Sequence, residues 1–349
     1  MQQTRFDEIL GGFSRVRIAV VGDLFLDRIF YINRDWDEIS VETGLAAYQV
    51  CRRSCVPGAA GVITNNLCSL RAGPRWGVGI TGNDGEAFDL CKALENTGCS
   101  TRYMVAQEGR FTPTYTKVFF ERPDGLEETH RIDTKNRSRM APENEDRVIA
   151  NLLELEKQVD AFVCLEQLAD GDCGVFTDRV IETLRQISLR GKARVVVDSR
   201  FHIAKFRDMI VKCNDNEILR AAGIEAELDG PFDRERVARV EKAMRSLQQN
   251  PKFPMFVSCG ADGIRVLEND RICTVPACRV EGPVDICGAG DSALTGIACA
   301  LCAGATLSEA ALLGNLVASI IVQQIGVTGT ATPEQLRARF AEYQQQRSK

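Results

Sequence analysis

One stretch of the chain, VDICGAGDSALTGIACA at residues 284–300, joins a glycine turn to small and apolar residues that predict a helix. Because Gly288, Ala289 and Gly290 carry little or no side chain, their backbone N–H groups can approach a ligand closely. A helix that starts there offers unpaired N–H groups and a positive dipole end, which suit a phosphate. Asp291 follows at once and is suited to taking a proton from an attacking hydroxyl. We hypothesise an anion hole with a base for phosphoryl transfer; the alternative is an ordinary glycine turn before a capped helix.

The composition is that of a soluble globular protein. Of the 349 residues, 44% are hydrophobic and 26% are charged. This length allows one large domain or two smaller ones, and we expect one domain over residues 1–349. The net charge of -5, without a long basic run, argues against nucleic-acid binding. The N-terminus is charged where a signal peptide is apolar, and no apolar run approaches the ~20 residues of a membrane helix. We therefore expect a cytoplasmic protein without a membrane partner.

The chain contains 14 cysteines, which we expect to be reduced because they are scattered through strand and helix patterns. Cys299 and Cys302 form a CxxC inside the apolar helix that follows Asp291. We interpret them as small packing residues; a metal or redox role is the alternative.

Short apolar runs alternate with helical patterns along most of the chain. This alternation predicts a doubly wound α/β fold, with a mostly parallel sheet between helices. The predicted strands are 17–22, 161–165, 194–198, 255–258 and 263–267, and the predicted helices are 86–96, 178–190 and 235–249. The polar last residues, 341–349, are expected to fray.

Two segments, about 30–57 and 103–135, have the loose alternation of strands exposed on one face. Residues 112–133 also predict a hairpin, because Pro123-Asp-Gly125 is a strong turn signal. We expect a small β-sheet lid that closes over a substrate. The alternatives are an edge extension or a dimer surface. A lid and a dimer surface are not exclusive, and we expect a homodimer that forms through the lid.

Two carboxylates follow the first predicted strand. Asp23 and Asp27 come directly after Gly22, where ligands bind beyond the carboxyl ends of parallel strands. Carboxylates there can accept hydrogen bonds from sugar hydroxyls. For Asp23 the alternative is capping a loop, so Asp27 is the preferred candidate.

Several short motifs occur in a fixed order. Together they resemble the ribokinase-like (PfkB-type) carbohydrate kinases over about residues 15–340, and most of all the heptose-7-phosphate kinase branch. The motifs are GDLFLD (22–27), PGAAG (57–61), TKV (116–118), RID (131–133), NDNE (214–217), SCGADG (258–263) and DICGAGD (285–291).

The resemblance implies a mechanism. Asp291 would deprotonate a sugar hydroxyl for in-line attack on the γ-phosphate of ATP, while the backbone N–H groups of residues 288–290 stabilise the transferring group. Asn214 and Glu217 would act on Mg²⁺ and its waters. The alternative for this pair is a helix capping box, which has the same spacing.

The resemblance also implies a nucleotide site. Ser258, Gly260 and Gly263 would line it, and Asn315 would lie near the adenine. The alternatives are a simple hairpin turn and a surface polar residue. Asp285 would help to hold a monovalent cation such as K⁺, or would only anchor the loop by accepting backbone N–H bonds.

On the acceptor side the resemblance implies that Gly58, Ala59 and Lys117 join Asp23 and Asp27. Here the sequence departs from the family pattern. Val62 replaces an amide, and Ala59 occupies a turn that usually needs Gly. The segment 166–171 lacks the Asp and Lys of the heptose kinases, and Ile286 and Cys287 replace hydroxyl residues.

Three functions remain open at this point. The leading hypothesis is an ATP- and Mg²⁺-dependent kinase for a sugar or sugar phosphate. The second is a non-catalytic sugar or nucleotide sensor, and the third is a kinase for a nucleoside or another alcohol. The departures place the identity of the acceptor in question, because a pocket that loses one hydrogen-bond partner can reject its substrate.

Overall fold

The computed structural model describes residues 1–169, 173–224, 233–248, 250–326 and 328–348. Its centre is a nine-stranded sheet in the order β15-β14-β13-β12-β11-β10-β1-β6-β7. β6, β1 and β10 to β13 pair in parallel, β7 joins β6 in parallel, and β14 and β15 form an antiparallel edge. The bounds are β1 (Ile18–Gly22), β6 (Arg75–Gly82), β7 (Cys99–Gln107), β10 (Ala161–Glu166), β11 (Arg194–Ser199), β12 (Ile210–Asn214), β13 (Met255–Ser258), β14 (Ile264–Glu268) and β15 (Arg271–Val275).

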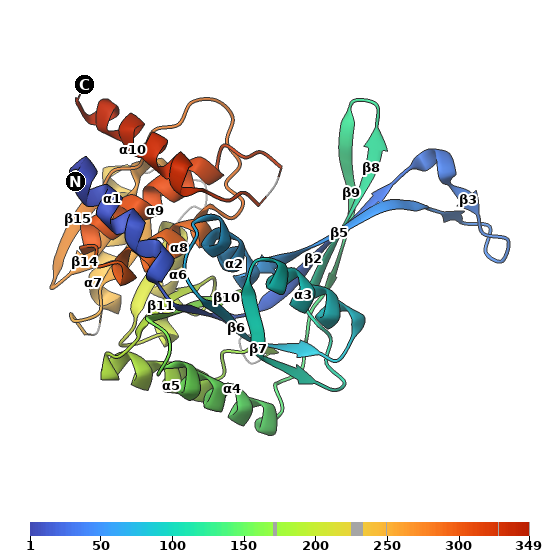
Figure 1. The fold of residues 1–349 in the computed structure, drawn as a ribbon, viewed down its shortest axis with the longest axis horizontal. Helices are drawn as coiled ribbons and strands as arrows, with labels where there is room; N and C mark the ends of the chain where they lie inside the picture. Colours follow the sequence, from blue (N-terminus) through green and yellow to red (C-terminus); the bar gives the residue numbers. More distant parts are fainter. Residues whose placement is uncertain (170–172, 225–232, 249, 327, 349) are drawn as a thin grey trace.

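Helices cover both faces of this sheet, so the doubly wound α/β prediction is confirmed (Figure 1). One buried cluster packs α1, α2, α3, α8, α9 and α10 onto the sheet, and a second packs α4, α5, α6 and α7 onto the opposite face. Strands such as β10 are buried along their whole length, which explains the apolar run of residues 161–165 before Glu166. The helices are α1 (Gln3–Gly12), α2 (Ala60–Ser69), α3 (Gly85–Asn96), α4 (Pro142–Leu155), α5 (Asp178–Arg190), α6 (Asp215–Ala221), α7 (Arg234–Leu247), α8 (Ala289–Cys302), α9 (Leu307–Ile321) and α10 (Pro333–Ser348).

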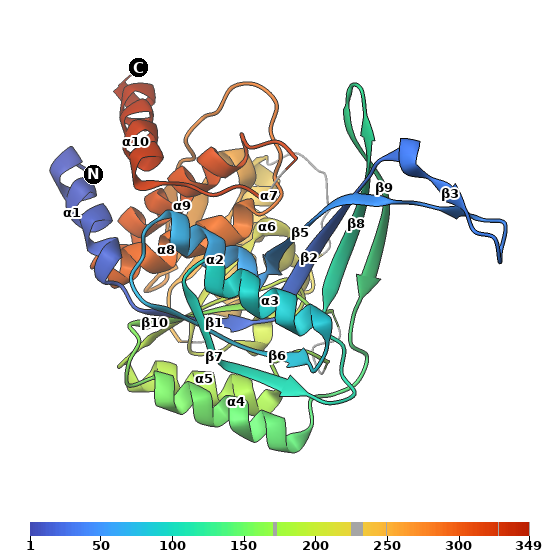
Figure 2. The ribbon, with the colours of Figure 1, turned by 45° about the vertical axis from the view of Figure 1, so that its right-hand side comes forward.

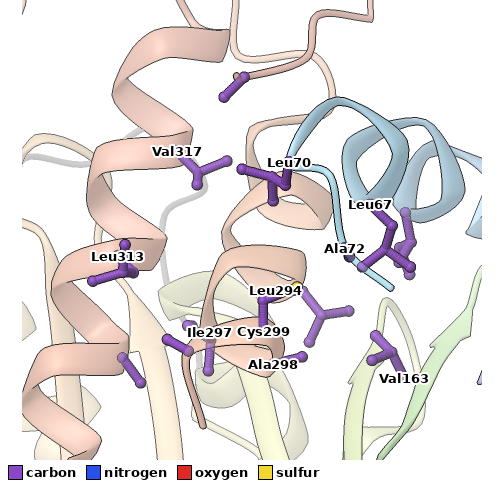
Figure 3. Packing of buried hydrophobic residues seen from close by; sticks show 14 of the residues in the cluster. Leu67, Leu70, Ala72, Val163, Leu294, Ile297, Ala298, Cys299, Leu313 and Val317 are labelled. Carbon is purple, nitrogen blue, oxygen red and sulfur yellow. The ribbon is translucent and has the colours of Figure 1, made fainter. Parts of the chain in front are cut away.

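Helix α8 is buried on all sides, and Figure 3 shows it between side chains of α2 and α9. Leu294 and Ile297 are fully buried there, a burial that contributes about 1.5–3 kcal/mol for each side chain. Gly296 allows the close approach of α9, because a Cβ on it would lie 3.0 Å from Cγ2 of Val317. This packing fixes the start of α8 at the carboxyl edge of the sheet.

The cysteines follow the prediction. All fourteen are free. Cys299 is fully buried in the core, and Cys302 is half-buried against the same cluster, so both serve as packing residues. No group of three or more His, Cys, Asp or Glu side chains within the described ranges is arranged to hold a metal ion.

A second sheet stands off the main one, as Figures 1 and 2 show. Its strand order is β5-β2-β8-β9, and we call it the lid sheet. The bounds are β2 (Leu24–Ile32), β5 (Val50–Ala59), β8 (Thr114–Arg122) and β9 (Gly125–Thr134), with a short extension formed by β3 (Glu38–Ile39) and β4 (Ala46–Ala47). The predicted hairpin is confirmed, because β8 and β9 pair antiparallel across Pro123 and Asp124.

The predicted lid boundaries need correction. The lid sheet already starts with β2 at Leu24, before residue 30. Residues 103–107 belong to β7, which pairs with β6 in the main sheet, so the second lid segment begins at Thr114. Both segments have strand-like sequences, and only the pairing partner distinguishes main-sheet from lid strands.

The helix ends depend on local capping. Helix α5 has the predicted bounds, because Thr177 caps its start and Gly191 ends it in the left-handed conformation. Helix α7 ends at Leu247, and residue 249, which was predicted within it, lies outside the described residues. Residues 341–348, which were expected to fray, are helical because α10 continues to Ser348, and residue 349 lies outside the described residues. Within the described chain, no helix is both long and apolar enough to cross a membrane.

Candidate active site

The loop before α8 is held in a conformation that requires glycine. Gly288 has φ +75°, and a Cβ on it would lie 3.0 Å from Cγ2 of Thr328. Asp285 anchors this loop by accepting hydrogen bonds from the backbone N–H groups of Cys287 at 2.9 Å and Gly326 at 3.0 Å. These two bonds lower the pKa of Asp285. This geometry agrees with the alternative in which Asp285 anchors the loop by accepting backbone N–H bonds.

Asp291 is the third residue of α8 and is 7% exposed. Among the described residues, no donor forms a hydrogen bond with its carboxylate; only its backbone carbonyl accepts one, from Thr295. Burial, followed by the nearby charge of Asp198, raises the pKa of Asp291 to about 6, although Arg200 and Lys212 oppose the rise. A carboxylate with this pKa can accept a proton near neutral pH.

A buried ion pair that sequence reasoning missed lies beneath the loop. Lys212 Nζ on β12 donates a hydrogen bond to Oδ2 of Asp198 at the end of β11, at 2.6 Å. Burial disfavours the charged form of Lys212, but the charges of Asp198, Glu217 and Asp291 outweigh it and raise its pKa. Gly290 gives the ammonium access to the loop, because a Cβ there would lie 3.0 Å from Nζ.

The sequence did contain a signal for this pair. Lys212 interrupts the otherwise apolar strand Ile-Val-Lys-Cys, and a charge in a buried strand needs a partner. Asp198 ends another predicted strand, at the sheet edge where ligands bind. What the sequence lacks is the sheet order, which makes β11 and β12 neighbours.

Asn214 and Glu217 form the capping box at the start of α6. Asn214 Oδ1 accepts from the Glu217 N–H, and Glu217 Oε2 accepts from the Asn214 N–H, both at 2.8 Å. Oε1 of Glu217 accepts no hydrogen bond from the part of the chain that the structure describes. Burial, followed by the charge of Asp198, raises the pKa of Glu217. The cap thus holds Glu217 in place by one oxygen and leaves the other available.

The residues predicted to line a nucleotide lie along one edge of the main sheet. Ser258 ends β13 and donates to the carbonyl of Cys213 at 3.2 Å. Gly263 has φ +90°, and a Cβ there would lie 2.2 Å from the carbonyl oxygen of Val275, so the turn that begins with Gly260 requires glycine at its end. Asn315 is buried and donates to the carbonyls of Val275 and Pro276, so the surface alternative for Asn315 is wrong.

Asp23 is tied to a loop. Its Oδ2 accepts from the backbone N–H groups of Gln167 at 3.0 Å and Leu168 at 3.3 Å, and its Oδ1 accepts from Val175 at 3.2 Å. Burial raises the pKa of Asp23, although these bonds oppose the rise. This geometry agrees with the alternative in which Asp23 caps a loop.

Asp27 differs from Asp23 in having an oxygen without a partner. Its Oδ1 is buried and accepts no hydrogen bond within the described ranges. Gly58 on the neighbouring strand makes room for this carboxylate, since a Cβ there would lie 2.1 Å from Oδ1. Burial raises the pKa of Asp27, and the charges of Lys117 and Arg131 oppose the rise. Lys117 also lowers the pKa of Asp285, so it acts on both the lid carboxylate and the glycine loop.

The departures from the family pattern lie next to these groups. Ala59 adopts φ +48° and ψ -120°, a conformation that favours glycine. Val62 is buried, and its Cγ1 lies 3.8 Å from the position of a Cβ on Gly288. In the segment 166–171, Glu166 is buried and bonded to Ser199, while Asp170 and Gly171 lie outside the described residues.

The sequence model of the pfkB family carbohydrate kinases matches residues 68–335. The chain belongs to this family. The members of this family are carbohydrate kinases that use ATP, and the resemblance seen in the motifs is confirmed.

Curated relatives include the bifunctional protein HldE of Wolinella succinogenes, 29% identical over 340 residues, covering 96% of this chain and 66% of that protein. HldE of Desulfatibacillum aliphaticivorans is 26% identical over 331 residues, covering 94% of this chain and 64% of the relative. The chain thus spans slightly less than two thirds of these relatives.

Solved structures share the fold. Phosphofructokinase-2 from Escherichia coli in complex with potassium has a TM-score of 0.69 at 16% identity, covering 94% of this chain and 99% of the other. Arabidopsis thaliana ribokinase complexed with ribose and ATP has a TM-score of 0.61 at 16% identity, covering 94% and 98%. The fold of this PfkB kinase is therefore ribokinase-like.

Proposed function

We propose that this kinase transfers the γ-phosphoryl group of ATP to a hydroxyl of a sugar phosphate, of the heptose-7-phosphate type, with Asp291 as general base. The observation that carries the proposal is the buried carboxylate of Asp291, which has a raised pKa and no donor among the described residues. The acceptor hydroxyl gives its proton to Asp291 while its oxygen bonds to the γ-phosphorus. The bond from that phosphorus to the β–γ bridging oxygen breaks, and its electron pair leaves with ADP.

The donor half of the site is built from backbone and buried charge. The N–H groups of Gly288 and Gly290, at the start of α8, would stabilise the negative charge that accumulates during transfer, whereas the N–H of Ala289 already donates to the carbonyl of Ile286 at 3.2 Å. Lys212 adds a fixed positive charge close to Gly290. Ser258, Gly260, Gly263 and Asn315 shape the edge on which the nucleotide would lie.

Mg²⁺ neutralises phosphate charge when it is bound. The available Oε1 of Glu217 fits such an ion, because Mg²⁺ keeps several waters and needs few protein ligands beside phosphate oxygens. Asn214 would act on the ion's waters while it holds Glu217 in the capping box. Asp285 would support K⁺ through the loop it anchors, since its carboxylate stays ionised.

The acceptor half lies on one face of the lid sheet. Asp27 pairs with Tyr115, and Lys117 pairs with Arg131, so these side chains share a face. The unpartnered oxygen of Asp27 would accept a sugar hydroxyl, while Lys117 and Arg131 would attract a phosphate on the acceptor. Gly58 and Ala59 would place their backbone beside the acceptor.

The test is a panel of acceptors with Mg-ATP, containing sugars, their phosphates and nucleosides, with product identified by ³¹P NMR. We expect the fastest transfer to a sugar phosphate, and strong loss of transfer in Asp291→Asn. Equal turnover by the variant would refute the base assignment. Preferred transfer to a nucleoside would refute the acceptor class, and binding of ATP without transfer to any acceptor would favour a sensor.

We also propose that the lid sheet forms a homodimer. The extension at β3 and β4 exposes apolar side chains, including Ile39 at 67% and Leu45 at 69% exposure. The outer strands β5 and β9 present free edges that a second copy can pair with. Sedimentation should give a dimer, and Ile39→Ser with Leu45→Ser should give a monomer. A monomeric wild type at working concentration would refute the proposal.

A further inference from the structure

The candidate site has an excess of negative charge where a triphosphate would have to bind. Asp198 lies near the carboxyl end of β11, while Glu217 and Asp291 lie in the first turns of α6 and α8, and the charge of Asp198 raises the pKa of both. Lys212 offsets one of them, because it is paired with Asp198 at 2.6 Å. A second cation near the γ-phosphate would therefore be needed for efficient transfer.

Arg200 is placed to be that cation. It directly follows β11, and its backbone N–H donates to the carbonyl of Glu166 at 3.2 Å. Its Nε donates to Oε1 of Gln167 at 2.8 Å. The residue is exposed, and within the described part of the chain its terminal nitrogens have no carboxylate at salt-bridge distance. The guanidinium is thus held on one side and free on the other.

The support behind Arg200 is firm. The backbone N–H of Gln167 donates to Asp23, which also holds Leu168 and Val175. Asp23 therefore fixes the residue that orients the guanidinium. The side chain of Gln167 also approaches the hydroxyl of Tyr115 on the lid sheet, so this support lies between the donor and acceptor halves.

Arg200 also acts on both functional carboxylates. Its charge lowers the pKa of Asp291 and that of Glu217, against the effect of burial. Arg200 follows Asp198 by two residues, and Lys212, the partner of Asp198, lies beside Gly290, so Arg200 stands at the sheet edge that carries the glycine loop.

We propose that Arg200 is a catalytic residue that contacts the transferring phosphoryl group, and that Gln167 positions it. The inference rests on the proposed phosphoryl transfer and adds a cation supplied by this chain itself. An arginine in such a position contributes about 10³–10⁵-fold to kcat in other phosphoryl-transfer enzymes.

The experiment compares Arg200→Gln, Arg200→Lys and Gln167→Ala with the control Arg207→Gln. Arg207 is a nearby exposed arginine whose charge acts on Asp208. We expect Arg200→Gln to lower kcat by at least about 100-fold with little change in the acceptor KM. Arg200→Lys should recover part of the lost kcat, and Gln167→Ala should lower kcat about 10-fold. The control should behave as wild type.

Two further readouts separate catalysis from structure. Arg200→Gln removes a positive charge that lowers the pKa of Asp291, so the acid limb of its kcat/KM profile should move to higher pH. Arg200→Lys keeps the charge and should leave the acid limb in place. Calorimetry should show that Arg200→Gln binds ADP normally but binds ADP with aluminium fluoride, a mimic of the transferring group, far more weakly. An unchanged kcat, an unmoved acid limb or unchanged affinity for the mimic would overturn the assignment.

The calorimetric readout also keeps the two proposals apart. A wild type that transfers phosphate to no acceptor would refute the proposed function, yet the affinity for the mimic would still decide the role of Arg200. A wild type that transfers phosphate while Arg200→Gln matches it in every measurement would refute Arg200 alone.

Discussion

The two halves of the candidate site differ in how tightly their polar groups are held. On the main sheet, Asp285 accepts two backbone N–H bonds, and Glu217 is held by the capping box with Asn214. On the lid sheet, Asp27 has an oxygen without a partner within the described ranges, and β9 is largely exposed. Apart from Asp291, whose carboxylate has no donor among the described residues, the half that would handle the common donor is fixed by the fold, and the lid half that would select the acceptor is held loosely.

This difference agrees with two of the departures from the family pattern. Ala59 ends β5 of the lid sheet and Val62 lies in the first turn of α2; in the loop before α8, Ile286 and Cys287 depart from the pattern, but Gly288, Gly290 and Asp291 keep it. A change on the lid side alters which acceptor fits, whereas a change at the start of α8 would remove the chemistry itself. The predictions that follow test this division, from the largest effect to the smallest.

The largest effect is expected for Asp291→Asn, which should lower kcat by about 10³-fold or more, since it removes the proposed base. The same variant should be more stable than wild type. The pKa of about 6 lies above the usual 3.8, so the ionised carboxylate destabilises the fold by up to ~3 kcal/mol at alkaline pH. This cost falls as the pH drops through 6 and is absent below the usual pKa. Urea unfolding at about pH 8 and about pH 4 should show a stability gain only at the higher pH. A less stable variant at the higher pH would contradict the buried charge.

Alanine variants of Asp27 and Asp23 should differ in what they lose: the first should lose affinity for the acceptor, and the second should lose stability. Asp27→Ala should raise the acceptor KM by about 100-fold and leave the fold intact, because its Oδ1 has no partner in the described chain. Asp23→Ala should lower the free energy of unfolding by ~1–3 kcal/mol, because three backbone N–H groups lose their acceptor. Acceptor kinetics and urea unfolding measure the two effects. Similar losses of stability in both variants would remove the distinction between the loop-holding Asp23 and the unpartnered Asp27.

Lys117→Met should reduce kcat/KM about 10-fold for a phosphorylated acceptor and leave the unphosphorylated sugar unaffected. The reason is that Lys117 would offer a charge to the acceptor phosphate, and its charge already acts on Asp27. Lys157→Met, at an exposed position after α4, is the control. Equal losses with both acceptors would show that Lys117 does not bind the phosphate.

The smallest effect is expected for Ala59→Gly, which should raise the free energy of unfolding by about 1 kcal/mol. Ala59 has φ +48°, so glycine relieves backbone strain at this position. The gain is reduced in part by the greater freedom of glycine in the unfolded chain. Thermal unfolding checks it, and Ala60→Gly, inside α2, should be destabilising instead. A loss of stability in Ala59→Gly would show that the turn is not strained.

The sequence predicts the parts of this molecule that depend on local patterns. The alternation of strands and helices, the hairpin at Pro123 and the glycine turn before Asp291 all follow from neighbouring residues. Pairing between distant strands is not encoded locally, which is why the boundary between β7 and the lid sheet was misplaced. The Asp198–Lys212 pair was missed for the same reason, because it joins two neighbouring strands of the main sheet. Asn214 and Glu217 show the converse case, since one spacing is compatible with the capping box that forms and with the proposed metal site.

The two ends of the chain leave the molecule side by side. Phe6 of α1 stacks on Phe340 of α10 with ring centroids 4.2 Å apart, and Arg337 bonds to Asp7. Figure 1 marks both ends on the side away from the lid sheet. A short linker could therefore join them, and new ends could be opened in the turn between β8 and β9. Such a circular permutant would cut the acceptor half and leave the donor half continuous, which would allow nucleotide binding to be studied with the lid sheet released.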